Sequence, residues 1–150
     1  MRVYLVIVDE SKEARVALRF AARRADKTGG TVNILALVPK QDFVAFGGVQ
    51  ATIEQEARDR AEVLASSAAS NLFSESGRMP SIDVRLGDSE KVIREYLGEH
   101  PEVAALVLGA APEGGPGPLV QHFSHCSGSL PCPLMVVPGG LSDEEIDRLS

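Results

Sequence analysis

Blocks of hydrophobic residues and blocks of mixed character alternate along the chain, and they predict strands and helices in turn. Val3–Val8 is an unbroken apolar run rich in β-branched residues, which is typical of a strand buried on both faces. Ser11 suits the N-cap of a following helix, and Thr28–Gly30 holds the glycines that commonly end one. The apolar positions on one face of that helix are Ala14, Leu18, Ala21, Ala22 and Ala25.

A second strand and the longest periodic segment of the chain come next. Thr31–Val38 predicts another buried strand. The helix after it is marked by apolar residues that recur at steps of three and four, namely Ile53, Ala57, Ala61, Leu64, Ala68 and Leu72. Ser81–Gly87 alternates between apolar and polar residues, which favours a third strand near an edge of the sheet.

The next segment repeats the alternation of helix and strand. Asp88 or Ser89 can cap a short helix, and Gly98 and Pro101 are placed to end it. Val103–Leu108 predicts the fourth strand.

The last part of the chain begins with a loop rich in glycine and proline. The loop covers Gly109–Leu119, and a short helix is expected over Leu119–Gly128. Pro133–Val137 predicts a fifth strand, and its prolines favour a place at the edge of the sheet. In the tail, Ser142 and Glu145 have the spacing of a capping box, so either a final helical turn or a frayed end is expected.

The order of these elements predicts an α/β fold. Strands that alternate with helices form a doubly wound parallel sheet, here five-stranded, with helices on both faces. We expect a single domain over residues 1–150, with a core at 2–138 and a tail at 139–150.

Charge and composition narrow the possible partners. The net charge of −6 argues against nucleic-acid binding, and no apolar run approaches the ~20 residues that span a membrane. The amino terminus lacks the features of a signal peptide, so a cytoplasmic protein is expected. Cys126 and Cys132 lack the spacing of a redox pair or a zinc site. No lysine or arginine lies between Arg94 and Arg148, so an anion bound there must rely on amides, hydroxyls or a metal.

The residues disfavour other doubly wound classes and a metal centre. A phosphoacceptor receiver domain needs a lysine after the fifth strand, which is absent, and only Asp88 could accept the phosphoryl group. The glycine-rich loops of a Rossmann site or an adenylating enzyme are missing after the first strand. His122, His125 and Cys126 lie close together in the sequence, but a further metal ligand at suitable spacing is lacking.

Several stretches resemble the universal stress protein family. The opening VYLVIVDESKEARVALRFAARRADKTGGTVNILALV is similar to that of the family, and VRLGDSEKVIREYL is similar to its third strand and helix. LVLGA and CPLMVV resemble its fourth and fifth strands. The similarity runs from Val3 to Pro138 and depends on the order and spacing of these pieces together.

This resemblance implies the strand order 3-2-1-4-5, with a ligand crevice between the first and fourth strands. In family members that bind ATP, the aspartate after strand one and the residue that ends strand two contact adenosine, and these correspond to Asp9 and Val38. The glycine-rich loop after strand four cradles the phosphates. In that family strand five pairs across a two-fold axis, so the resemblance implies a homodimer. The interface residues would be Leu134, Met135, Val136 and Val137.

The glycine-rich loop departs from the family pattern G-x2-G-x9-G-[ST]. Gly109 matches the first position, but the second falls on Pro112 and the last pair on His122 and Phe123. Three prolines in this loop lack an N–H, and Glu113 adds a negative charge. A phosphate cradle needs convergent N–H groups, so tight binding of ATP with Mg²⁺ is disfavoured. The remaining glycines could wrap another ligand, but a turn is favoured; they are Gly114, Gly115 and Gly117.

Two further features leave alternatives open. Lys12, Arg15, Arg19 and Arg23 form a basic stripe, which we interpret as a solvated helix face rather than a phosphate site. The loop holding Phe43 and Phe46 is a lid, a subunit contact, or a segment folded on its own core.

The function that fits these observations is a dimeric sensing or interaction module that does not hydrolyse ATP. No enzyme signature is found. One alternative is an ATP-binding universal stress protein with weak or no hydrolysis, and another is a binder of a different small ligand in the crevice. A protein partner is also compatible with this interpretation.

Overall fold

A five-stranded parallel sheet forms the centre of the molecule. The computed structural model describes residues 1–38 and 47–150, apart from the side chains of residues 47–51. The strands are β1 (Val3–Val8), β2 (Thr31–Val38), β3 (Ser81–Leu86), β4 (Val103–Ala110) and β5 (Leu134–Pro138). Their order is β3-β2-β1-β4-β5, which confirms the predicted topology and leaves β3 and β5 at the edges. The loop with Phe43 and Phe46 lies outside the described residues.

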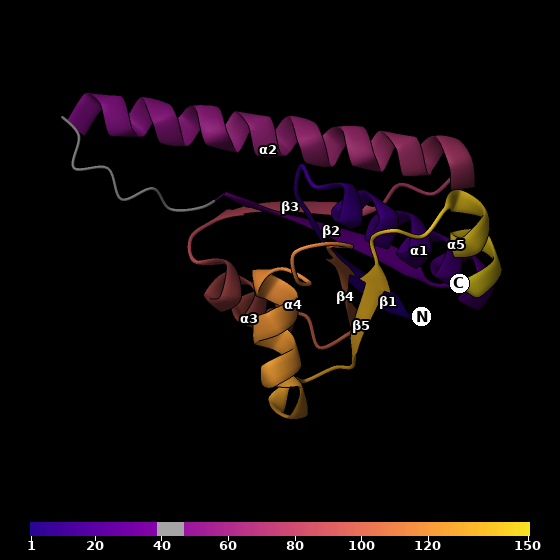
Figure 1. Cartoon of the computed structure of the whole chain (residues 1–150). Helices are drawn as coiled ribbons and strands as arrows, with labels where there is room; N and C mark the ends of the chain where they lie inside the picture. The colour runs from indigo at the N-terminus through magenta and orange to yellow at the C-terminus, as the bar shows by residue number, and fades with distance from the viewer. Residues whose placement is uncertain (39–46) are drawn as a thin grey trace.

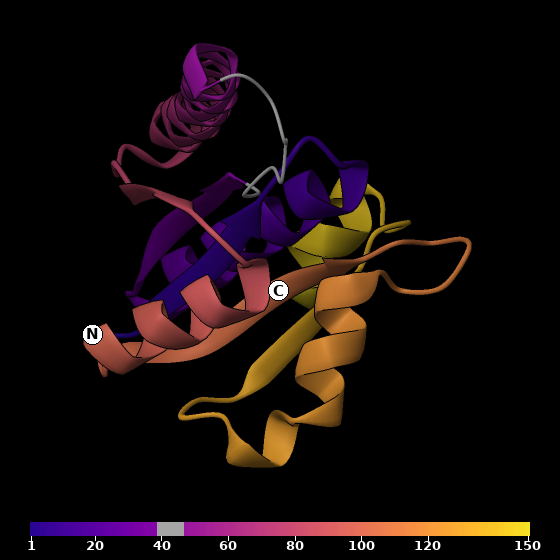
Figure 2. The ribbon, with the colours of Figure 1, turned by 90° about the vertical axis from the view of Figure 1, so that its left-hand side faces the viewer.

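Helices cover both faces of this sheet (Figures 1 and 2). The helices are α1 (Lys12–Thr28), α2 (Gly47–Ser76), α3 (Ser89–Glu99), α4 (Pro118–His125) and α5 (Asp143–Leu149), with a short 3-10 turn at Ser127–Ser129. α1, α2 and α5 pack on one face, and α3 and α4 pack on the other. Among the described helices, none has both the length and the apolar character needed to cross a bilayer.

The alternation of side chains along β1 builds both layers of the core. Tyr4, Val6 and Val8 contact the layer of α1, α2 and α5, while Leu5 and Ile7 contact the layer of α3 and α4. A strand whose two faces are both covered must be apolar throughout, which explains the unbroken run in the sequence.

Several element boundaries differ from the sequence-based expectation. β3 ends one residue earlier, at Leu86, and β5 is shifted by one residue, to Leu134–Pro138. β4 continues two residues further, to Ala110, so Gly109 lies in the strand rather than in the loop. α4 begins one residue earlier, at Pro118, because proline is compatible with the first position of a helix. That helix stops at His125, and a 3-10 turn follows in place of an extension to Gly128.

The tail forms an ordered helix that is part of the core. Ser142 accepts a hydrogen bond from the N–H of Glu145, and the Glu145 carboxylate accepts one from the N–H of Ser142, so the predicted capping box is present. Ile146 is 1% exposed and belongs to the core layer of α1 and α2. A buried isoleucine and a complete cap account for a helix in place of a frayed end.

Candidate functional site

Two hollows lie at the carboxyl ends of the central strands. At this point the chain changes from adding strands on one side of β1, as β2 and β3, to adding them on the other side, as β4 and β5. The smaller hollow, of about 90 Å³, is enclosed by the ends of β1 and β4 and the first turns of α1 and α4. The larger, of about 430 Å³, lies between the ends of β1 and β2 and helix α2. Asp9 and Ser11 line both, so the hollows form one divided crevice. This is the position at which open α/β sheets bind ligands.

The turn after β1 fixes the direction of Asp9. The N–H and the hydroxyl of Ser11 both donate hydrogen bonds to Oδ1 of Asp9, the N–H over 2.8 Å. The hydroxyl of Ser11 also accepts a hydrogen bond of 3.2 Å from the N–H of Ala14, which caps α1. Within the described residues, Oδ2 of Asp9 receives no hydrogen bond, so it is open to a ligand hydroxyl.

Val38, the last residue of β2, borders the larger hollow. Its side chain is 1% exposed, and its carbonyl oxygen accepts a hydrogen bond of 3.1 Å from the N–H of Gly87. The side chain therefore belongs to the core. Any polar contact of Val38 with a ligand would have to share a carbonyl that already has a partner.

Gly109 is required by packing between β4 and α1. A Cβ atom at this position would overlap the carbonyl oxygen of Glu13 in the first turn of α1. Gly139, directly after β5, also lies close to this turn. A Cβ atom added to Gly139 would be 2.7 Å from the Cβ atom of Glu13. Both residues let the start of α1 sit directly on the strand ends, which closes the floor of the smaller hollow.

The loop between β4 and α4 extends away from the sheet (Figure 2) and is closed by turns. The N–H of Ala111 donates a hydrogen bond of 3.2 Å to the carbonyl oxygen of Pro116. Gly114, Gly115 and Gly117 have φ values of 75°, 87° and 99°, a region that favours glycine. These positive φ values are the physical reason for three glycines here, in agreement with the favoured turn interpretation.

The amino terminus of α4 faces the smaller hollow. Gly117 is the N-cap residue, and no side chain caps the helix. Pro118 has no N–H, and the N–H of Gln121 bonds to the carbonyl oxygen of Gly117 over 3.1 Å. Leu119 and Val120, whose N–H groups lie between these positions in the first turn, both line the hollow. The helix terminus thus offers two amide donors to an anion.

The start of α4 does not coincide with the last pair of the family motif. The count assigned the last motif pair to His122 and Phe123, but both lie inside α4, and Phe123 is completely buried. The helix begins at Pro118 because the loop before it is shorter than the motif requires. The sequence pattern places the helix start at Leu119, one residue after the observed start at Pro118, a residue type that is common at the first helical position.

The charge around the crevice is mostly negative. Asp9 and Glu13 line the smaller hollow, and no lysine or arginine of the described residues does so. The larger hollow is bordered by Glu10 and by Arg60 of α2, a residue that the sequence analysis did not assign to the site. α2 passes over the carboxyl end of β2 (Figure 1), and its residue Arg60 borders the larger hollow.

The histidines and cysteines do not assemble a metal centre in the part of the chain that the structure describes. His122 instead lies beside Glu90 of α3, with Nδ1 and Oε2 separated by 3.4 Å. Burial raises the pKa of the Cys132 thiol, which keeps the thiol protonated and weakly nucleophilic.

Comparisons of the sequence with family models and of the fold with solved structures both find universal stress proteins. The sequence model of the universal stress protein family matches residues 1–138. The structure is similar to the universal stress protein UspA from Lactobacillus plantarum, with a TM-score of 0.77, 19% identity, and coverage of 91% of this chain and 97% of that one. A search of curated proteins finds no match.

Some of the similar structures were solved with a nucleotide, including one from Arabidopsis thaliana and one from Archaeoglobus fulgidus. A universal stress protein family protein from Arabidopsis thaliana with AMP bound has a TM-score of 0.61 and 17% identity, with coverage of 96% of this chain and 95% of that one. The universal stress protein from Archaeoglobus fulgidus in complex with dAMP has a TM-score of 0.56 and 20% identity, with coverage of 91% and 97%. At these identities the similarity shows the fold alone.

Proposed function

The chain belongs to the universal stress protein family, and on this premise we propose that it is a sensing module that binds a nucleoside monophosphate without hydrolysing ATP. The larger hollow would hold the nucleoside, and the smaller hollow a single phosphate group. Its setting is proposed to be the cytoplasm. The AMP and dAMP complexes of similar structures support the ligand class.

The observation that supports this proposal most directly is the limited anion-binding capacity of the smaller hollow. It offers two amides at the start of α4, and its described lining includes no cationic side chain. Two amides at a helix terminus suit one phosphate. A triphosphate would place further charges near Asp9 and Glu13, where repulsion opposes binding.

The nucleoside part of the proposal follows from the larger hollow. Its volume of about 430 Å³ is within the range of small-molecule sites. Ala57, Ala61 and Leu64 of α2 supply an apolar wall, and Oδ2 of Asp9 is an acceptor for a ribose hydroxyl. An apolar wall with one directed acceptor is suited to a flat base attached to a sugar.

Thermal denaturation with adenosine, AMP and Mg-ATP at equal millimolar concentrations tests the proposal. A ligand at about 100 times its Kd stabilises the fold by about 2.7 kcal/mol, which corresponds to a rise of several degrees in Tm. We expect the largest rise with AMP. Asp9→Ala should abolish most of it, whereas Asp26→Ala, which removes an exposed acid at the other end of α1, should not.

Two results would contradict this function. The first is a larger rise in Tm with Mg-ATP than with AMP. The second is release of phosphate from ATP by the wild-type protein that Asp9→Ala eliminates; either would favour the ATP-binding alternative. If none of the three compounds changes Tm, the crevice serves another class of ligand.

We also propose that two copies pair along β5. This strand is an edge of the sheet, and Val136 is 39% exposed on it. Val137 is buried at 2%, so only its backbone is available for such a contact. An edge strand with an exposed apolar side chain invites pairing, and the family resemblance points to the same strand.

A further inference from the structure

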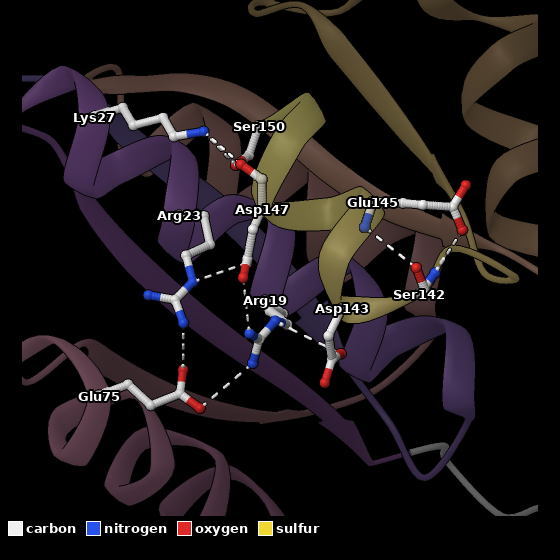
Figure 3. Close-up of polar contacts among 9 residues, drawn as sticks. All are labelled: Arg19, Arg23, Lys27, Glu75, Ser142, Asp143, Glu145, Asp147 and Ser150. Atoms are coloured by element: carbon white, nitrogen blue, oxygen red, sulfur yellow. Dashed lines mark hydrogen bonds and ion pairs between the residues drawn. The ribbon is translucent and has the colours of Figure 1, made fainter.

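The basic stripe of α1 consists of Lys12, Arg15, Arg19 and Arg23. Within the described residues, Arg19 and Arg23 form ion pairs with acidic side chains, and Lys12 and Arg15 form none. Figure 3 shows Arg19 and Arg23 surrounded by acidic residues of α2 and α5. Arg19 lies 3.5 Å from Glu75 and 3.3 Å from Asp147, and Arg23 lies 3.1 Å from Asp147. These two cations therefore have internal partners, in contrast to the solvated face that the sequence suggested.

Lys12 and Arg15 form the other half of the stripe. Both are exposed, and neither makes an ion pair within the described residues. They line a hollow of about 240 Å³ between α1 and α2, whose opposite wall includes Asn71 and Leu72. Lys12 is also the first residue of α1, where the helix dipole is already positive, so its charge adds to the local positive potential.

Arg19 also lines this hollow, but its partners lie within the protein. Its Nε atom is buried and makes no hydrogen bond with any described residue. Oδ1 of Asp143 lies 3.6 Å away, which is close enough for an ion pair but too far for a hydrogen bond. Because this Nε atom is buried beside the Asp143 carboxylate, it belongs to the ion-pair cluster and is not accessible to a ligand in the hollow.

We propose that the hollow between α1 and α2 binds a phosphate group, either as inorganic phosphate or as a phosphomonoester. Lys12 and Arg15 provide two positive charges without internal partners, and a phosphomonoester has a charge of about −1.5 to −2 at neutral pH. The lining also includes Glu75 and Asp143, but both form ion pairs with Arg19, so Lys12 and Arg15 are the charges left to attract an anion. The planar guanidinium of Arg15 can bind two phosphate oxygens at once.

This site is separate from the crevice. None of the cations that line it borders either crevice hollow, and its walls are the outer surfaces of α1 and α2. The inference does not depend on the proposed function, so each can fail without the other.

The test is titration of the full chain with inorganic phosphate and, separately, with glycerol phosphate, followed by calorimetry and by amide chemical shifts. We expect saturable binding and shifts at residues of the hollow, such as Lys12, Arg15 and Asn71. The double variant Lys12→Gln/Arg15→Gln should weaken binding by about tenfold or more. Because both side chains are exposed, this variant should fold normally, which its Tm will verify.

A matched control separates a specific site from a general effect of charge. Lys91→Gln/Arg94→Gln removes two exposed cations from α3, on the opposite side of the sheet, and should leave the affinity within about twofold. Tighter binding of glycerol phosphate would identify an ester as the ligand, and equal affinity would identify the phosphate group alone.

Three outcomes would overturn the proposal. One is the absence of saturable binding of both compounds at millimolar concentration. Another is equal weakening by the α3 control. The third is binding whose amide shifts are confined to the crevice, at Asp9 to Ser11 and Gly117 to Gln121, because the crevice would then be the phosphate site.

Discussion

Gly109 of β4 and Gly139, the residue directly after β5, both contact the first turn of α1. Their lack of a side chain is needed because a Cβ at either position would collide with Glu13 or with the backbone of Ala110. Gly114, in the loop before α4, has no atom within 4 Å of its Cβ position and is glycine because of its φ of 75°. Glycines that a motif count groups together thus have different physical roles.

This difference predicts unequal effects of alanine at the two kinds of position. Gly109→Ala forces β4 away from α1 and should lower the free energy of unfolding by about 3 kcal/mol. Gly114→Ala only strains the backbone and should lower it by about 1 kcal/mol. Urea unfolding of both variants measures the values. Equal losses would mean that the start of α1 can move without cost, contrary to the packing described here.

At the scale of elements, α5 is fastened to the rest of the molecule by a cap, a buried side chain and ion pairs. Ser142 and Glu145 form the capping box, and Ile146 enters the core. Lys27 of α1 donates a hydrogen bond of 2.7 Å to the carbonyl oxygen of Asp147 (Figure 3). This helix follows residues 1–138, the segment that the family model matches.

Removal of the cap should loosen α5 measurably. Ser142→Ala deletes the acceptor for the N–H of Glu145, and the loss of such a cap costs about 1 kcal/mol. Faster amide exchange in α5 and a lower urea midpoint are the expected results. Ser66→Ala, an exposed substitution within α2, serves as the control and should have little effect on either measurement.

The same capping box makes a small part of the stability depend on pH. The backbone N–H of Ser142, and then its side chain, hydrogen-bonds the Glu145 carboxylate and lowers the pKa of that group. A lowered pKa in the folded state means that the stabilisation is present above the unfolded pKa, near 4.3, and is lost as the pH falls through the folded value.

Comparison of the wild-type protein with the Glu145→Gln variant tests whether the stability falls, as expected, when the pH is lowered. The variant lacks the titrating group, so any stability advantage of the wild type should shrink between about pH 5 and pH 3. Urea unfolding at a series of pH values measures the difference. An advantage that grows on acidification would show that the carboxylate is not held by the cap in solution.

An element can be predicted from the sequence when the interactions that determine it lie within a short segment of the chain. Buried strands such as Val3–Val8 are predictable because both faces must be apolar, and Ser142 with Glu145 signals its own cap. Strand order was available only through the family resemblance. The pairing of Arg19 with Asp147 joins residues 128 positions apart, and the placement of Arg60 depends on where α2 lies, so neither can be read from a local pattern.

At the scale of the whole molecule, the sheet has two unpaired edges with different side chains. On β3, Arg85 makes ion pairs of 3.0 Å with Asp83 and 2.8 Å with Glu99, and such charges discourage strand pairing. On β5 Val136 and Pro138 are exposed, and within the described ion pairs no residue of this strand takes part. β3 also exposes Ile82 at 40% and Leu86 at 36%, so the two edges differ in charge and not in exposed apolar surface. The contrast favours β5 as the edge that meets a second copy.

If β5 is this interface, Val136→Asp should convert a dimer into a monomer. A two-fold axis through the paired edges brings the two introduced carboxylates near each other, and burying unpaired charge costs several kcal/mol. Sedimentation equilibrium should therefore report the mass of two chains for the wild type and of one chain for the variant. Val63→Asp places the same charge on α2, where the side chain is 66% exposed, and should remain dimeric. A Val136→Asp protein that keeps the mass of two chains would place the interface elsewhere, and a monomeric wild type would exclude the dimer altogether.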